Sequence, residues 1–328
     1  MIYPKFLNNN DIIGITALSG GMGKYLDNLD LSVSNIKKHG FNIEETKDVR
    51  SKDELSISPE EKVKEFNNLI NNKKISMIIG ACGGDFTYQT LPYYDFNIIK
   101  NNPKWIMGSS DITFILYMIT TYLDISTIYG FNASSFDSKK LHKSQELVFD
   151  IIKGNIPHQD SYDKYEINKK DRIDNNYNLE IPVKWELLNN DFNITGRIIG
   201  GCLDCLRYLP GTKYDYTSNF IERYKKDGII WYFDVFSLTA EDFYLTLLQL
   251  KENNWFKYIK GVIVGRVKFP NSYTEMTYQD ALKKVFGNIP IAFNADIGHV
   301  LPKMTIINGS IAHIICKNNK GKIEQILE

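Results

Sequence analysis

Short apolar runs alternate with amphipathic segments along the first 150 residues. The apolar runs predict buried strands, at 11–18, 74–81, 105–108 and 124–130. The segments between them have helical periodicity and predict helices, at 26–38, 58–72 and 111–123. Strands and helices that alternate in this way are typical of a mainly parallel sheet with helices on both faces.

The character of the chain changes after residue 153. Residues 154–186 are polar and rich in Asp, Asn, Lys and Tyr, and we interpret them as a linker with short strands. Apolar runs then resume and predict further strands, at 193–201, 228–235, 260–267, 289–298 and 304–317, with helical stretches at 217–226, 239–253 and 276–286. The sequence therefore predicts two α/β domains, 1–153 and 187–328, with a site between them or at the carboxyl ends of strands.

The composition argues against several classes of partner. The 328 residues include 39 Lys and Arg and 39 Asp and Glu, and a formal net charge of zero argues against a nucleic-acid partner. The N-terminal segment has no basic region followed by a long apolar stretch, and the apolar run at 112–123 is too short to cross a bilayer. We expect a cytoplasmic protein with no membrane partner.

Four cysteines are scattered along the chain. A disulfide framework is not expected at this chain length and cysteine density. Cys202 and Cys205 form a CxxC motif, but no second Cys or His pair stands at the spacing that a zinc site needs. We interpret both as small apolar residues in a helix interior, and we expect neither a metal nor an organic cofactor.

Two glycine-rich segments follow predicted strands. Residues 19–25 lack the Walker A pattern, because Tyr25 stands where a phosphate loop has Ser or Thr after its lysine, and a flexible turn is the better interpretation. Residues 81–86 contain paired glycines, which let a backbone approach a ligand closely and direct N–H groups at an anion. Paired glycines are also common in ordinary turns.

The sequence Gly-Ser-Ser-Asp at 108–111 lies between a predicted buried strand and a predicted helix. A serine at such a turn can present its hydroxyl near the positive end of the following helix, as a nucleophile requires. Ser109, Ser110 and Asp111 are equally good helix-capping residues. The local sequence leaves both interpretations open.

A nucleophilic serine needs a histidine base and a carboxylate that orients the histidine. Of the five histidines, His299 follows a predicted strand and a glycine, in a loop at the strand's carboxyl end. Asp234 is an acid inside an otherwise apolar strand, where an unpaired charge is costly. Asp296 and Glu241 are alternative partners for the histidine.

Segments spread over nearly the whole chain resemble the LD-carboxypeptidase family of serine peptidases, which includes the microcin C immunity peptidases. The most specific are the block from Gly83 to Thr113 and the pair Gly298-His299. Shorter similarities lie at 12–20, 196–212, 229–237 and 295–312. The resemblance implies a flavodoxin-like N-terminal domain, a swivelled α/β C-terminal domain, a homodimer, and a Ser-Glu-His triad at the domain interface.

The family motifs assign roles to five residues of this chain by resemblance. Ser110 corresponds to the nucleophile and His299 to the histidine, while the backbone N–H groups of Gly84 and Asp111 correspond to the oxyanion hole. The family glutamate is replaced by Asp234, which is shorter by one methylene, about 1.5 Å. Aspartate orients histidine in other triads, so Asp234 is the acid that we expect.

The function implied by the resemblance is hydrolysis without a cofactor. The expected substrate is the amide bond between an L-centre and a C-terminal D-amino acid in cytoplasmic muropeptides, as in peptidoglycan recycling. One alternative is a microcin C immunity-like hydrolase of peptidyl or aminoacyl nucleotide toxins. Another alternative is an inactive binding module on the same scaffold.

Overall fold

The computed structural model describes residues 1–169 and 172–328. The chain divides into two compact units, each built from two segments. The first unit comprises Met1–Ile156 and Asn168–Asn178, and the second comprises Pro157–Ile167 and Leu179–Glu328. The domain limits at 153 and 187 stay a prediction, and the two units are described separately below.

The first unit has a parallel sheet with helices on both faces. Its strands are β1 (Ile12–Thr16), β2 (Asn42–Glu45), β3 (Ile75–Gly80), β4 (Trp105–Gly108) and β5 (Thr127–Tyr129). Its α-helices are α1 (Leu26–Lys38), α2 (Pro59–Asn71), α3 (Phe96–Asn101), α4 (Thr113–Leu123) and α5 (Lys143–Ile152). Its 3-10 helices are η1 (Lys47–Arg50), η2 (Thr87–Tyr93), η3 (Ser110–Ile112) and η4 (Ala133–Phe136).

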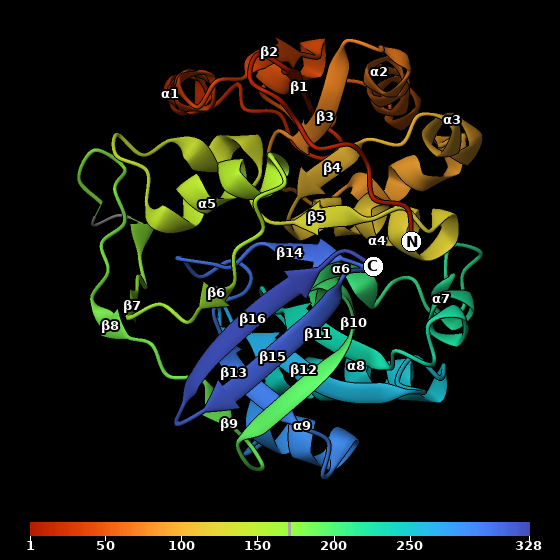
Figure 1. The fold of residues 1–328 in the computed structure, drawn as a ribbon, viewed down its shortest axis with the longest axis vertical. Coiled ribbons are helices and arrows are strands. Elements are labelled where there is room, and N and C mark those ends of the chain that lie inside the picture. Colours follow the sequence, from red (N-terminus) through yellow and green to blue (C-terminus); the bar gives the residue numbers. More distant parts are fainter. Residues whose placement is uncertain (170–171) are drawn as a thin grey trace. The chain divides into compact units, whose positions relative to one another are not determined.

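Within this unit the strand order is β2-β1-β3-β4-β5, with every adjacent pair parallel. This is the flavodoxin-like order, so the fold class expected for the N-terminal part is confirmed. Figure 1 shows α1 and α5 on one face of the sheet and α2, α3 and α4 on the other. The central strands are buried on both faces because helices cover both, which explains why they form nearly continuous apolar runs.

The sequence also explains how α2 begins. The Ser58 hydroxyl accepts a hydrogen bond from the Glu61 N–H at 3.2 Å, and the Glu61 carboxylate accepts one from the Ser58 N–H at 3.0 Å. These reciprocal bonds form a capping box, and Pro59 occupies the first helical position, where its missing N–H is harmless. The helix therefore starts where the polar pattern predicts it.

The second unit has a mixed sheet. The strands of this unit are β6 (Gln159–Asp160), β7 (Lys164–Tyr165), β8 (Ile181–Pro182), β9 (Glu186–Leu187), β10 (Phe192–Cys202), β11 (Ile229–Asp234), β12 (Ile259–Gly265), β13 (Ile291–Ala295), β14 (Ile306–Asn308), β15 (Ile311–Lys317) and β16 (Lys320–Ile326). Strands β7, β8 and β14 lie outside the mixed sheet. Its helices are α6 (Leu203–Leu206), α7 (Thr217–Arg223), α8 (Ala240–Glu252) and α9 (Tyr278–Phe286).

The order of the large sheet is β6-β16-β15-β10-β11-β12-β13-β9 (Figure 1). Strands β10, β11, β12 and β13 are parallel to one another, whereas β15, β16, β6 and β9 add antiparallel pairs at the two sides. Strands β7 and β8 pair separately. The predicted α/β character of the C-terminal part is therefore confirmed, with a sheet that is parallel only in its central region.

Two elements differ from the sequence prediction. The helix expected at 111–123 begins as the 3-10 turn η3 before α4, and the strand expected at 304–317 is broken into β14 and β15. Gly309 lies in this break with a φ of +82°, a conformation that ends a strand. In the part of the chain that the structure describes, no helix is long and apolar enough to span a membrane.

Candidate active site

In the first unit, β1, β3 and β4 are adjacent and parallel, so their carboxyl ends lie at one edge of the sheet. The order of strands reverses between β1 and β3, which is the position where ligands bind in open α/β sheets. The segments that leave this edge are residues 17–25, 81–86 and 109–112. The two glycine-rich segments and the Ser-Ser-Asp sequence therefore meet.

Ser110 has a φ of +61°, in the left-handed region that a residue with a β-carbon rarely adopts. The neighbouring backbone is held by side chains from the next strand and loop. Ser110 N–H donates to the Tyr129 hydroxyl at 3.2 Å, and Ser109 N–H donates to Asn132 Oδ1 at 2.9 Å. A non-glycine residue in this conformation stores about 1–3 kcal/mol of strain, a feature concentrated at functional sites.

Ser109 does not cap a helix with its side chain. Ser109 is at the N-cap of η3 and Ile112 is at the N-cap of α4, and neither side chain makes a capping hydrogen bond. The carboxylate of Asp111 instead points to the other loops at this edge. The Asp111 side chain therefore serves tertiary contacts.

The paired glycines lie directly against this turn. A β-carbon on Gly83 would stand 2.9 Å from both Cβ and Oγ of Ser110. A β-carbon on Gly84 would stand 2.3 Å from Ser19 Oγ and would also overlap the Glu54 carboxylate. Only glycine allows the 81–86 segment to come this close, so Gly83 and Gly84 are required for packing at the serine.

The carboxylate of Asp111 joins the three loops. Its Oδ2 accepts a hydrogen bond from Ser19 Oγ at 2.5 Å and one from Thr87 N–H at 2.7 Å. Burial raises the pKa of this carboxyl, and the hydrogen bonds from Ser19 and Thr87 partly oppose that rise. Asp111 thus ties the segments after β1 and β3 to the residue that follows Ser110.

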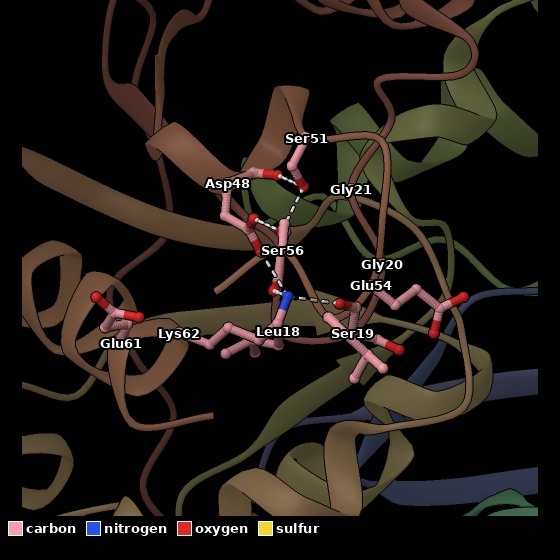
Figure 2. A network of polar contacts seen from close by, with 12 residues as sticks. Leu18, Ser19, Gly20, Gly21, Asp48, Ser51, Glu54, Ser56, Glu61 and Lys62 are labelled. Carbon is pink, nitrogen blue, oxygen red and sulfur yellow. Dashed lines mark hydrogen bonds and ion pairs between the residues drawn. The ribbon is translucent and has the colours of Figure 1, made fainter. Parts of the chain in front are cut away.

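A buried lysine binds the backbone of the segment after β1 (Figure 2). Lys62, on α2, donates from Nζ to the carbonyl oxygens of Ala17 at 3.1 Å and Ser19 at 2.9 Å. It also forms an ion pair with Asp48, whose side chain and that of Lys62 are each about 1% exposed. Asp48 in turn accepts a hydrogen bond from Ser56. Lys62 therefore fixes the backbone of the serine whose hydroxyl contacts Asp111.

In the second unit, Asp234 is the last residue of β11 and His299 lies in the loop after β13. Nδ1 of His299 is 2.7 Å from Oδ2 of Asp234, and the His299 backbone N–H donates to Oδ1 at 3.2 Å. The Asp234 side chain is fully buried, whereas that of His299 is 18% exposed. The ring also packs on Phe236, with centroids 4.6 Å apart. A carboxylate held in this way can orient an imidazole through Nδ1.

Two glycines allow the histidine to reach this carboxylate across β12, which lies between β11 and β13. A β-carbon on Gly265, at the end of β12, would stand 2.2 Å from the carbonyl oxygen of Ile297. A β-carbon on Gly298 would stand 2.0 Å from Asp234 Oδ1, and Gly298 has a φ of +99°. The loop therefore crosses the end of β12 beside Gly265 and turns toward Asp234 at Gly298.

Asp296, one alternative partner for the histidine, is engaged elsewhere. Oδ1 of Asp296 pairs with Arg266 at 2.6 Å, and Oδ2 accepts from Trp185 Nε1 at 2.8 Å and Tyr162 N–H at 3.1 Å. Asp296 is fully buried, so these bonds satisfy a charge that would otherwise be costly. Its role is to anchor the loop that carries His299.

Glu241, the other alternative, holds a different loop. Its carboxylate accepts hydrogen bonds from Ser272 Oγ at 2.7 Å and Thr274 N–H at 2.9 Å. Burial alone would raise the pKa of Glu241, but hydrogen bonds from Thr274 and Ser272 lower it to about 2. The acid beside the histidine is therefore Asp234.

The position of Cys202 differs from the sequence prediction. Cys202 ends β10 and is the register partner of Asp234, so it does not lie inside a helix. Single ligand atoms of Cys202, Asp234 and His299 all lie within 4.8 Å of one another. The contact with Cys205 and burial raise the pKa of the Cys202 thiol well above its usual value.

The five residues assigned by resemblance are distributed over both units. Ser110, Gly84 and Asp111 lie at the sheet edge of the first unit, and Asp234 and His299 form a contact pair in the second. Sequence reasoning missed several supporting residues, namely Ser19, Lys62, Thr87, Tyr129 and Asn132. Lys62 had a detectable signal, because a lysine four positions before Phe66 lies on the apolar stripe of α2.

A strained serine after a parallel strand and a buried carboxylate–imidazole pair are the parts from which serine hydrolases are built. Comparisons with known proteins give the family. The family model described as the LD-carboxypeptidase N-terminal domain matches residues 13–130, and the model of the LD-carboxypeptidase C-terminal domain matches residues 195–314. The two models together cover well over half of the chain, and the chain belongs to the LD-carboxypeptidase family.

Individual relatives are distant but cover long stretches. A Vibrio cholerae protein named "Putative carboxypeptidase" is 25% identical over 99% of this chain and 98% of its own length. The microcin C7 self-immunity protein MccF of Escherichia coli is 26% identical over 75% of this chain and 73% of its own length. The solved structure of an MccF-like protein from Streptococcus pneumoniae, in complex with AMP, is 25% identical and covers 97% of this chain and 99% of its own, with a TM-score of 0.80.

Proposed function

We propose that this protein is a serine hydrolase that cleaves the amide bond between an L-centre and a C-terminal D-amino acid in a muropeptide. The observation that carries the proposal is the 2.7 Å contact between His299 Nδ1 and the buried Asp234 carboxylate. Membership in the LD-carboxypeptidase family supports the substrate class. The shorter acid is compatible with this role, because in the second unit its carboxylate already reaches the imidazole.

In the proposed mechanism, Ser110 Oγ attacks the scissile carbonyl while His299 Nε2 takes the serine proton. Asp234 holds Nδ1–H of the ring and stabilises the imidazolium that forms. The oxyanion accepts hydrogen bonds from the backbone N–H groups of Gly84 and Asp111, and each such donor is worth about 10²–10³ in rate. His299 then protonates the leaving amine, and water releases the acyl group by the reverse proton path.

Several features of the first unit support the role of Ser110. The N–H of Ser110 itself donates a hydrogen bond to the Tyr129 hydroxyl. The N–H of the next residue, Asp111, is therefore the oxyanion donor at this turn. Asp111 is the second residue of η3, and N–H groups in a first helical turn have no intrahelical acceptor. The positive φ of Ser110 corresponds to the strained turn on which such nucleophiles stand.

A second candidate substrate is a peptidyl or aminoacyl nucleotide. It is favoured by the relationship to the microcin C7 self-immunity protein and by the AMP complex of the Streptococcus pneumoniae relative. The same residues would act, with an acyl-nucleotide bond in place of the L,D-amide. Only the groups that recognise the leaving part of the substrate would differ.

A paired assay separates the two substrates. The purified protein is incubated with a muropeptide tetrapeptide ending in D-alanine and, in parallel, with an aminoacyl sulfamoyl adenylate. We expect release of D-alanine, with no release by S110A. Turnover of the adenylate alone would replace the first proposal with the second.

A serine-directed reagent tests whether the scaffold is catalytic at all. A fluorophosphonate probe should label the folded protein at Ser110, and S110A should not be labelled. S109A is the matched control, because Ser109 adjoins Ser110 but has extended backbone with a φ of −152°. Absence of labelling in a folded wild-type protein would favour the inactive binding module.

The proposed assembly is a homodimer in the cytoplasm, an inference from the family resemblance. Light scattering after size-exclusion chromatography should give twice the mass of the 37.8 kDa chain. A monomeric mass at micromolar concentration would contradict the dimer without affecting the proposed chemistry.

A further inference from the structure

The residues around the histidine in the second unit include a third potential ligand. Cys202 ends β10, Asp234 ends the adjacent β11, and the two are register partners across the parallel pair. His299 reaches them from the loop after β13. One ligand atom each of Cys202, Asp234 and His299 lies within 4.8 Å of the other two.

These ligand types and their charges suit a zinc-class divalent cation. Thiolate, imidazole and carboxylate are the three side-chain ligands of protein zinc sites. A divalent ion with one thiolate and one carboxylate forms a neutral cluster, and a neutral cluster lowers the free-energy cost of burying charge. Cys202 and Asp234 are almost fully buried, while the partly exposed His299 ring supplies the side from which an ion enters.

Side-chain movements of up to about 1 Å would form such a site, because the three ligand atoms already lie within 4.8 Å of one another. In a tetrahedral zinc site with ordinary Zn–N and Zn–O bonds, the nitrogen and oxygen ligands are roughly 3.3 Å apart. Nδ1 of His299 and Oδ2 of Asp234 are 2.7 Å apart, so the two groups need to separate by about half an ångström. The fourth position of the ion is left for water.

We propose that Cys202, Asp234 and His299 form an inhibitory binding site for a zinc-class divalent cation. Binding converts the Cys202 thiol to a thiolate and releases its proton to solvent. The ion takes the Nδ1 lone pair, so the proton of the neutral imidazole resides on Nε2. A ring with a metal on one nitrogen and a proton on the other has no lone pair with which to accept a proton from a nucleophile.

The site is tested by titrating the full-length, metal-free protein with Co²⁺, whose thiolate complexes show an intense near-ultraviolet charge-transfer absorption. We expect a saturable band at one ion per chain in the wild-type protein. C202A should lose the band, and it should bind Zn²⁺ at least about tenfold more weakly, because even loss of a second-shell partner costs about 10–100-fold in metal affinity. H299N should lose the band as well.

C205A is the matched control, since it removes the other cysteine of the CxxC motif and leaves the three ligands in place. It should keep the band and the Zn²⁺ affinity. Circular dichroism of each variant shows that it is folded. Absence of the band in the wild-type protein, or its persistence in C202A, would overturn the site.

This readout requires no substrate, so it fails or succeeds independently of the proposed hydrolase activity. Where turnover is measured, Zn²⁺ should inhibit the wild-type protein and C205A at concentrations that leave C202A active. Equal inhibition of C202A and the wild-type protein would show that the inhibitory ion binds elsewhere.

Discussion

At the scale of single residues, the carboxylate of Asp234 decides what His299 can do. An asparagine at this position keeps the shape of the side chain but removes the charge that stabilises an imidazolium, and it favours the wrong tautomer of the ring. We expect D234N to fold and to lose about 10⁴ in kcat. Steady-state kinetics with the substrate that the paired assay identifies measures the change, and a loss smaller than about tenfold would exclude Asp234 from the mechanism.

The positive φ of Ser110 leads to a second prediction, for stability. Glycine adopts this conformation without the steric penalty that a β-carbon imposes, about 1–2 kcal/mol. S110G should therefore be more stable than S110A by about 1 kcal/mol, and the proposed mechanism predicts that both lack activity. Urea unfolding of the two variants measures the difference.

Ser109 provides the matched control for backbone strain. Its φ of −152° is ordinary extended backbone, where glycine has only an entropic disadvantage of about 0.5–1 kcal/mol relative to alanine. S109G should thus be less stable than S109A, the opposite order to position 110. The same order at both positions would contradict strain at Ser110.

At the scale of elements, the buried pair of Lys62 and Asp48 fastens α2 to the segment after β1. K62M leaves the Asp48 carboxylate buried without its cation, and breaking a buried pair in this way costs about 3–5 kcal/mol. The double variant D48L/K62M removes both charges and should regain much of that stability. The free energies of unfolding of K62M, D48L and D48L/K62M test this coupling. A destabilisation of the double variant equal to the sum of the two single effects would contradict it.

The start of α5 should make stability depend on pH. His142 is its N-cap, and Nδ1 accepts a hydrogen bond from the Ser144 N–H at 3.2 Å. Burial, with a smaller contribution from Lys143, lowers the pKa of His142 to about 4. Between the unfolded value of about 6.5 and the folded value of about 4, the unfolded state binds more protons, so stability is present at neutral pH and falls as the pH falls.

H142N removes the titrating group but keeps a residue that caps well. Its free energy of unfolding should change less than that of the wild-type protein between pH 7 and pH 4.5. Urea midpoints at several pH values across this window give the comparison. Parallel curves for the two proteins would show that His142 does not contribute.

At the scale of the whole molecule, residues in and beside the short strands of 157–186 contribute buried side chains and hydrogen bonds to the second unit. Trp185 is fully buried and Tyr162 nearly so, and both bond to Asp296, which anchors the loop of His299. Gln159 also donates to the carbonyl of Thr305 at 2.8 Å. A fragment of residues 157–328 should therefore unfold cooperatively, whereas a fragment of residues 187–328 should not.

Thermal unfolding of the two fragments, followed by circular dichroism, tests this boundary. Equal cooperativity would support the limit at 187 that composition predicts. Loss of cooperativity in the shorter fragment would place the boundary near residue 157, because the buried Asp296 would have lost two of its partners.

The sequence alone determined most of the elements and the family to which the chain belongs. Apolar runs and helical stripes located β3, β4, α1 and α2, because neighbours within a few positions set these patterns. The polar residues at 108–111, Asp234 and His299 could each be identified because they follow or interrupt an apolar run. Family resemblance then assigned them roles.

Only the tertiary structure decided which side chains are partners. Asp234 and His299 are 65 positions apart, and their contact depends on the strand order and on two glycines that let one loop cross a strand end. For the same reason the sequence could not choose between Asp234, Asp296 and Glu241, or place Cys202 beside the histidine. Periodicity reflects local contacts, whereas a partner across a sheet is set by register and packing, which residues far apart in the chain determine together.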